Sequence, residues 1–215
     1  MALIYTQARE RMVQEQLVSR GISDPRVLAA MGRVPRHLFV DESLRDRAYD
    51  DHPLPIGEGQ TISQPYMVAL MAETLQLTSS ECVLEVGTGS GYLTAVLAEL
   101  GARVLSVEMS EYLAGRARMT LQELGYHNVT VYLGDGTLGW NAAAPFDAIV
   151  VGAAAPCLPR PLLSQLRLGG RLVIPMGEED LQTLVRVWKA PAGIREEYFG
   201  ECRFVKLHGA YGWEN

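Results

Sequence analysis

The sequence predicts an α/β fold in which a doubly wound, mostly parallel sheet carries helices on both faces. Short aliphatic runs alternate with helix-like stretches through the middle of the chain, and a glycine-rich turn follows the first run at residues 87–91. Hydrophobic residues make up 48% of the 215 residues, which is enough for a sizeable core. This alternation is typical of parallel sheets, whose neighbouring strands are joined by helices.

Composition excludes several classes of protein. The formal net charge is −6 and no block of Lys or Arg stands out, which argues against charge-driven binding to nucleic acid. Apolar runs end well before about 18 residues, so we expect no membrane span, and residues 1–11 are unlike a signal peptide. The three cysteines form no CxxC pair and the four histidines lack metal-ligand spacing. We therefore expect a cytoplasmic protein with reduced thiols and no metal.

The N-terminal part is predicted to be helical. Apolar residues recur at helical spacing before Gly21, which would end the first helix. Asp24 followed by Pro25 is a typical helix start, and this second helix should reach about Met31. Residues 50–65 contain closely spaced prolines and glycines and predict a long loop, which in a compact domain is usually functional.

Strands and helices then alternate along the chain. We expect strands at Cys82–Val86, 103–107, Val129–Leu133, Phe146–Val151 and 171–174, and edge strands at 181–189 and 195–207. Helices are expected at 92–100, at 110–124 with Ser110 as cap, and at 159–166. This gives one domain, with a helical extension and loop at 1–65, a ligand-binding core at 78–190 and a C-terminal segment at 191–215. Ligands of such sheets bind at the carboxyl ends of the strands, so the loops after Val86, Val107 and Leu133 are the candidate site.

Residues 83–92, VLEVGTGSGY, carry the strongest local signal. A strand that runs into Gly87, Gly89 and Gly91 lets the backbone approach a ligand closely and turns a helix N-terminus towards it. The NAD fingerprint GxGxxG would need a third glycine at the position of Tyr92. A purely structural glycine turn remains the alternative.

Carboxylates follow the next two predicted strands. Glu108 ends the second strand 21 residues after Gly87, where it can accept hydrogen bonds from both hydroxyls of a ribose. Asp135 lies between Gly134 and Gly136, where it can accept from an adenine amino group. Taken singly, Glu108 can also be interpreted as a surface acid that caps the next helix. Asp135 can likewise be interpreted as part of an ordinary turn. Together with the glycine loop they indicate a nucleoside, and the incomplete fingerprint favours S-adenosylmethionine over a dinucleotide.

The loop at residues 53–65, PLPIGEGQTISQP, is the second candidate feature. Ser63 precedes a predicted helix, so an ordinary helix N-cap is the alternative to a role in a site. No nucleophile-elbow motif surrounds this serine, which argues against acyl transfer.

From about residue 12 to 213 the sequence resembles the protein-L-isoaspartate O-methyltransferase family. The segments that carry the resemblance are RGI at 20–22, VPR at 34–36, PLPIG at 53–57, GQTISQP at 59–65, VLEVGTGSGY at 83–92, AAAP at 153–156 and GGRLVIP at 169–175. The glycine loop alone indicates only the broad class of S-adenosylmethionine methyltransferases. The GQTIS segment is the specific mark of the family, and it favours an active-site role for Ser63.

The resemblance implies a class I, Rossmann-like methyltransferase with a seven-stranded sheet, an N-terminal helical extension and a C-terminal segment at the sheet edge. It implies methyl transfer from S-adenosylmethionine, leaving S-adenosylhomocysteine, to the free α-carboxylate of L-isoaspartyl residues in aged proteins and peptides, which starts their repair. Ser63 would orient that carboxylate, beside Thr61 and Ile62. The implied cofactor contacts come from Gln60, Glu85, Gly87, Thr88, Gly89, Gly91, Glu108, Met109, Asp135 and Gly136. A monomer that binds damaged proteins, and neither nucleic acid nor membrane, is the expected form.

The sequence departs from the family pattern at three positions. Lys206 stands where relatives usually carry proline, His208 follows it, and Tyr66 stands where many relatives carry histidine. These differences bear on peptide preference and leave the reaction type untouched. The alternatives are a methyltransferase for another carboxylate or a small molecule, and a silent module that only binds the cofactor or damaged peptides. Methylation of a nucleic acid amine would require an Asn-Pro-Pro-Tyr-type motif, which the sequence lacks.

Overall fold

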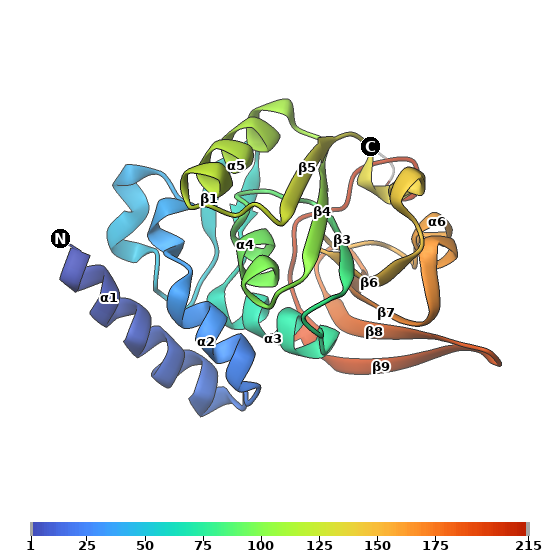
Figure 1. The fold of residues 1–215 in the computed structure, drawn as a ribbon, viewed down its shortest axis with the longest axis horizontal. Coiled ribbons are helices and arrows are strands. Elements are labelled where there is room, and N and C mark those ends of the chain that lie inside the picture. Colours follow the sequence, from blue (N-terminus) through green and yellow to red (C-terminus); the bar gives the residue numbers. More distant parts are fainter. Residues whose placement is uncertain (1, 214–215) are drawn as a thin grey trace.

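A seven-stranded sheet organises the structure, a computed structural model that describes residues 2–213 (Figure 1). Its strands are β3 (Cys82–Val86), β4 (Arg103–Glu108), β5 (Val129–Leu133), β6 (Phe146–Val151), β7 (Leu166–Gly177), β8 (Gln182–Ala190) and β9 (Gly193–Cys202). They lie in the order β5-β4-β3-β6-β7-β8-β9. The pairs from β5 to β7 are parallel, while β8 pairs antiparallel with both β7 and β9. The predicted doubly wound, mostly parallel sheet is confirmed, and its switch point lies between β3 and β6.

Helices cover both faces of this sheet because its strands are apolar on both sides. Along β3, Val83 joins the core on one face, whereas Leu84 and Val86 join the core on the other. The first face is covered by α3 (Pro65–Leu75), α4 (Tyr92–Glu99) and α5 (Glu111–Glu123), and the second by α6 (Arg160–Gln165). The N-terminal helices α1 (Ala2–Arg11) and α2 (Pro25–Arg33) pack beyond α3 and α4, as Figure 1 shows.

Local sequence signals explain the helix ends. Asp24 caps α2 by accepting a hydrogen bond from the Arg26 N–H at 2.7 Å, and Pro25 is the first residue of that helix. Gly21 adopts a left-handed conformation with φ of 93° and ends the preceding helical stretch as predicted. Ser110 caps α5 through the Leu113 N–H.

Three expectations for chain segments are wrong. Residues 50–65 are not a plain loop, because β1 (Leu54–Gly57) and β2 (Gln60–Ile62) pair there as an antiparallel hairpin. β7 is longer than the expected strand at 171–174 and passes through Gly169 and Gly170. β9 ends at Cys202 rather than near 207, because the following residues leave the sheet edge and pair with Ala154.

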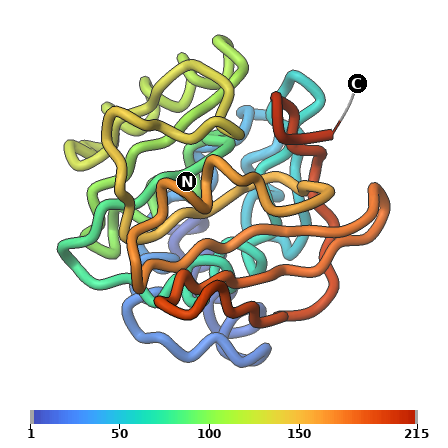
Figure 2. Tube along the Cα trace, turned by 90° about the vertical axis from the view of Figure 1, so that its right-hand side faces the viewer, coloured from blue at the N-terminus to red at the C-terminus, as the bar shows by residue number. Residues whose placement is uncertain are grey.

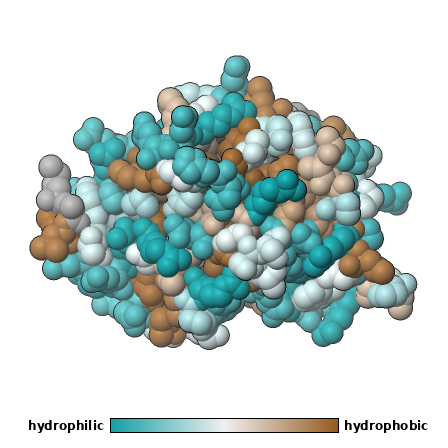
Figure 3. All heavy atoms as spheres, in the orientation of Figure 1, coloured by the Kyte–Doolittle hydropathy of each residue, from teal (hydrophilic) through white to brown (hydrophobic). Residues whose placement is uncertain are grey.

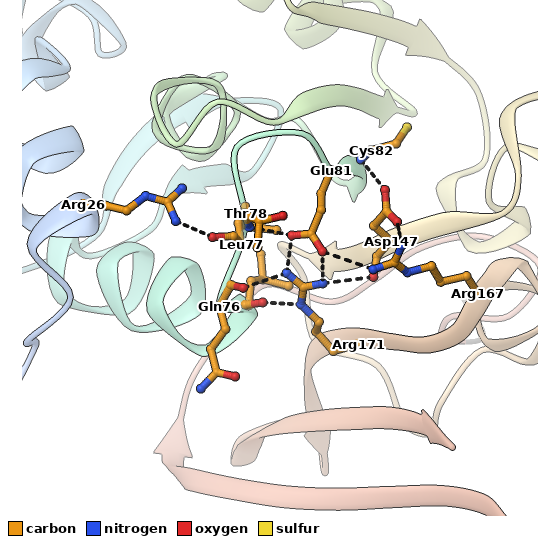
Figure 4. A network of polar contacts seen from close by, with 10 residues as sticks. Arg26, Gln76, Leu77, Thr78, Glu81, Cys82, Asp147, Arg167 and Arg171 are labelled. Carbon is orange, nitrogen blue, oxygen red and sulfur yellow. Dashed lines mark hydrogen bonds and ion pairs between the residues drawn. The ribbon is translucent and has the colours of Figure 1, made fainter. Parts of the chain in front are cut away.

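A buried ionic network ties together the amino ends of the central strands (Figure 4). Arg171 on β7 donates two hydrogen bonds, of 2.5 and 2.6 Å, to the carboxylate of Glu81, which lies just before β3. Both side chains are at most 7% exposed. Arg171 also donates to the carbonyls of Leu75 and Gln76 at the end of α3. Burial opposes ionisation of Glu81, but hydrogen bonds from Arg171 and the Thr78 N–H outweigh it and lower its pKa. The network therefore joins a helix and two strands that are distant in sequence.

Apolar residues are scattered among hydrophilic ones on the face shown in Figure 3. Within residues 2–213, no helix combines the length and the apolar character that crossing a membrane would require.

Candidate active site

A cavity opens at the carboxyl ends of β3, β4 and β6, where the switch point of the sheet was predicted to place a ligand. Its wall is formed by residues 58, 60–63, 86–90, 107–110, 136, 152–153 and 205–208, together with Val68, Tyr92 and Leu93. The wall thus brings together the two candidate features of the sequence, which are the loop that carries Ser63 and the glycine turn.

At the glycine turn, the cavity is lined by backbone atoms without side chains. Gly87 and Gly89 have φ values of 86° and 53°, a region that side chains disfavour. A Cβ on Gly136 would lie 2.6 Å from Val86 Cγ1, and one on Gly152 would lie 3.1 Å from the Gly87 carbonyl oxygen. The Thr88 hydroxyl is 2.5 Å from that of Ser106 on β4, which ties the turn to its neighbouring strand. A bulky ligand can therefore lie directly on the ends of the strands.

Glu108 lies at the end of β4 and lines the cavity, although it is only 8% exposed. One carboxylate oxygen accepts from the Gly89 N–H at 2.8 Å, and the other accepts from the N–H groups of Met109 and Ser110 at 2.9 Å. The alternative of a surface acid is wrong, because this buried carboxylate holds the glycine turn in place. An ionised carboxylate has about four acceptor positions. Three are taken by backbone, which leaves roughly one for a hydroxyl in the cavity.

Asp135 does not line the cavity, although its neighbour Gly136 does. One oxygen accepts from the Thr137 N–H and hydroxyl, at 2.8 and 2.6 Å, and the other accepts from the Ala210 N–H at 2.8 Å. The Asp135 carboxylate thus caps a short helical turn, which agrees with the alternative that Asp135 belongs to an ordinary turn. It also anchors the C-terminal segment.

Gly91 and Glu85 also lie outside the cavity wall. Glu85 is fully buried between β3 and α4; one oxygen accepts from the Thr94 hydroxyl at 2.5 Å, and the other has no partner among the described residues. Burial raises the pKa of Glu85 to about 7, and the nearby hydroxyls of Ser106 and Thr94 only partly oppose that rise. Its place is behind the glycine turn rather than against a ligand.

The loop side of the cavity is formed by Gln60, Thr61, Ile62 and Ser63, all of which line it. The N-cap residue of α3 is Gln64, without a side-chain cap bond, so the alternative of Ser63 as the helix cap is wrong. The Ser63 hydroxyl has no hydrogen-bond partner within the described part of the chain. It is half-buried and remains available to a ligand.

Arg116 on α5 holds the β1–β2 hairpin by donating to the Ile56 carbonyl at 3.1 Å. The buried side chains of Ile56 and Ile62 fix the inner face of this hairpin. The loop side of the cavity is therefore anchored to α5, the helix that Ser110 caps.

The C-terminal segment forms a wall that the residue patterns did not predict. Ala154 donates to the Val205 carbonyl at 2.8 Å and accepts from the Leu207 N–H at 2.7 Å, so residues 205–207 pair beyond the end of β6. Figure 2 shows this segment in dark red, leaving the sheet and running up the side of the molecule. Gly152 and Ala153 were also missed, although they follow the fourth predicted strand and the same strand-end rule applies to them.

The residues present fit an S-adenosyl nucleoside. The glycine turn accepts a bulky group, the spare acceptor position of Glu108 suits a hydroxyl, and apolar side chains such as Val86 and Val107 complete the wall. Within residues 2–213, no cluster of His, Cys, Asp and Glu has the arrangement of a metal site. A Rossmann-like sheet with this glycine turn and strand-end carboxylate matches the arrangement expected of a class I S-adenosylmethionine-dependent methyltransferase.

The model of the family protein-L-isoaspartate(D-aspartate) O-methyltransferase matches residues 7–211, and the chain belongs to this family. The protein-L-isoaspartate O-methyltransferase 1 of Syntrophobacter fumaroxidans is 59% identical over 210 residues, which cover 98% of each chain. The corresponding protein of Syntrophus aciditrophicus is 55% identical over 212 residues, covering 97% of each.

Solved structures agree with these relatives. One named protein-L-isoaspartate O-methyltransferase superposes with a TM-score of 0.86 and 30% identity, covering 95% of this chain and 67% of that one. A Plasmodium falciparum structure named for the same family, in complex with S-adenosyl-L-homocysteine, gives a TM-score of 0.79 at 28% identity. It covers 93% of this chain and 98% of the other.

Proposed function

We propose that this protein transfers a methyl group from S-adenosylmethionine to the free α-carboxylate of L-isoaspartyl residues in aged proteins and peptides. Membership of the family supports the reaction. The observation that carries the proposal is that Ser63, whose hydroxyl has no partner among the described residues, and the glycine turn with Glu108 line one cavity. An acceptor and a methyl donor bound there would lie next to each other.

The acceptor explains why so few residues are needed. A carboxylate with a pKa near about 3.5–4 is already ionised at pH 7, so no general base has to remove a proton. When bound, the cofactor supplies a methyl group on a sulfonium, which is an excellent leaving group. The task of the protein is to align the reactants and to exclude water, and such positioning lowers barriers by roughly 7–11 kcal/mol.

Each wall of the cavity has a distinct role in this proposal. Ser63 donates a hydrogen bond to one oxygen of the substrate carboxylate, and Thr61 and Ile62 shape the pocket around it. On the opposite wall, Glu108 accepts from the ribose. The other cofactor contacts that we propose come from Gln60, Gly87, Thr88, Gly89, Met109 and Gly136, all of which line the cavity.

Three residues keep an indirect part in the proposal. Gly91 starts α4 and Glu85 lies buried beneath the turn, so both would shape the cofactor side from behind. Asp135 would reach the adenine amino group only through an acceptor position that Thr137 and Ala210 leave unused.

The deciding experiment uses two peptides that differ only in an isoaspartyl or a normal aspartyl linkage, together with labelled S-adenosylmethionine. We expect label on the isoaspartyl peptide alone. Calorimetric titration with S-adenosylhomocysteine runs in parallel. Saturable binding without transfer to either peptide would reject the proposed acceptor and favour a silent binder.

A further inference from the structure

The cavity rim carries a cation whose role the proposed reaction does not explain. Among the described residues that line the cavity, Lys206 is the only Lys or Arg, whereas Glu58 and Glu108 contribute carboxylates. The whole chain has a formal charge of −6, and the turn between β7 and β8 adds Glu178, Glu179 and Asp180. An acidic peptide would therefore meet mostly like charge except at this lysine.

The backbone of Lys206 is held in a fixed register. The hydrogen bonds from Ala154 to the Val205 carbonyl and from the Leu207 N–H to the Ala154 carbonyl flank it on both sides. The indole N–H of Trp213 adds a third bond to the Ala154 carbonyl at 2.8 Å. The position of the Lys206 backbone at the end of the sheet is therefore fixed.

The ammonium group of Lys206 forms an exposed ion pair that another carboxylate can replace. It lies 2.9 Å from a carboxylate oxygen of Glu179 and 5.7 Å from the centre of the Trp213 ring. The side chains of Lys206 and Glu179 are 41% and 57% exposed. Such exposed ion pairs contribute little to stability, and an ammonium has three donors, of which Glu179 occupies one. A second carboxylate can join or replace Glu179 without leaving a buried charge behind.

We propose that Lys206 is a specificity-determining residue that binds an acidic side chain next to the isoaspartyl residue of a substrate. The inference rests on the proposed function and names the class of peptide which that site prefers. Because the interaction is exposed, it steers and holds the flanking carboxylate and does not touch the transferred methyl group.

The test compares two pairs of isoaspartyl peptides, with Glu or Gln placed directly before or directly after the isoaspartyl residue. The measured quantity is the ratio of kcat/KM for the Glu peptide over the Gln peptide, at low and at high salt. For the wild type we expect a ratio of about two to five in at least one pair, carried by KM and reduced by salt.

Three variants separate the role of Lys206 from general effects. Lys206→Met should bring this ratio of kcat/KM values to about one, since the charge contact with the flanking carboxylate is lost. Glu179→Gln frees the ammonium and should raise the ratio above that of the wild type. Arg203→Gln, which removes an exposed cation outside the cavity wall, is the matched control and should keep the wild-type ratio.

Equal ratios in the wild type and in Lys206→Met, with methyl transfer intact, would overturn the inference and leave the proposed function standing. Absence of transfer to every isoaspartyl peptide by the wild type would overturn both.

Discussion

Ser63 and Glu85 show how differently single polar side chains are placed in this protein. The Ser63 hydroxyl lies in the cavity wall and has no hydrogen-bond partner among residues 2–213, so a ligand can use it. The Glu85 carboxyl is fully buried; Thr94 donates to one of its oxygens, and the other has no partner in the part of the chain that the structure describes. The first side chain should affect the reaction, and the second should affect stability as a function of pH.

Replacing Ser63 by alanine should lower kcat/KM for an isoaspartyl peptide by roughly ten- to a hundredfold. The change removes one hydrogen bond, worth about 1–3 kcal/mol where a charged acceptor is desolvated. Cofactor affinity, measured by titration with S-adenosylhomocysteine, should stay within about twofold, and Ser63→Thr should restore much of the rate. Full catalytic efficiency in Ser63→Ala would remove this residue from the mechanism.

Replacing Glu85 by glutamine should change how stability depends on pH. The folded-state pKa of about 7 lies above the ordinary value of 4.5, so the folded protein holds the proton more tightly between these pH values. Stability of the wild type relative to Glu85→Gln therefore falls as pH rises from 4.5 to 7, by about 3 kcal/mol, and levels off above. Urea unfolding at pH 5 and pH 8 measures this, and a difference that does not vary with pH would contradict it.

At the scale of elements, capping chemistry could be predicted from sequence, whereas short strands could not. Asp24 and Ser110 cap their helices as expected, because a cap depends on contacts only two or three residues away. The β1–β2 hairpin was missed because its strands are too short to show an alternating pattern and contain Pro55 and Gly57.

β7 shows a related failure. The expected strand began at Arg171, but the pairing with β6 already starts at Leu166 and passes through Gly169 and Gly170 with a register shift. Gly169 has φ of 79°, and a Cβ on Gly170 would lie 2.9 Å from the Asp147 carbonyl oxygen. The glycines are thus required inside the strand by an irregularity and a close approach, neither of which is visible in one sequence.

The ionic network at the amino ends of the strands predicts a large loss of stability when it is broken. Glu81→Gln leaves Arg171 buried without its counterion, which should cost about 3–5 kcal/mol in the free energy of unfolding. Because the pKa of Glu81 is lowered in the folded protein, its contribution is present above its ordinary pKa and is lost as pH falls through the folded value.

Chemical denaturation at pH 7 measures the effect of Glu81→Gln. Glu42→Gln removes a carboxylate that is 89% exposed and 3.7 Å from Arg45, so it is the control and should change stability by less than about 0.5 kcal/mol. Similar losses in the two variants would contradict the importance of burial.

At the scale of the whole molecule, the strand-end side of the cavity and the loop with Ser63 followed from the sequence, whereas the wall formed by residues 205–208 did not. Gly87, Glu108 and Gly136 line the cavity because each lies at or just after the end of a strand whose direction is set by the parallel sheet. Residues 205–208 reach the cavity through pairing with Ala154, a contact between distant parts of the chain that no local pattern records. The same long-range docking explains why Asp135 meets Ala210 rather than the cavity.

The docking of the C-terminal segment can be tested at one glycine. A Cβ on Gly209, which has φ of 134°, would lie 2.2 Å from the Asp135 carboxylate, so Gly209→Ala should displace the segment. We expect the Kd for S-adenosylhomocysteine and the KM for peptide each to rise by about tenfold. A tenfold rise corresponds to a loss of about 1.4 kcal/mol in binding free energy.

The matched control is Gly193→Ala at the start of β9. Its φ is 128°, and a Cβ there would meet nothing within 4 Å, so it carries the same backbone strain without the collision. Unchanged binding in Gly209→Ala, or an equal loss in Gly193→Ala, would contradict the proposed coupling.

The span of the cavity wall has a consequence for biosynthesis. Its residues run from Glu58 to His208, so a chain emerging from the ribosome builds the hairpin and the glycine turn long before the closing wall exists. At about 5–20 residues per second, translation of the residues between the glycine turn and the closing wall takes several seconds. Throughout that time the strand ends are exposed to solvent and to chaperones. A ligand that needs the complete cavity can stabilise the fold only after translation has passed His208.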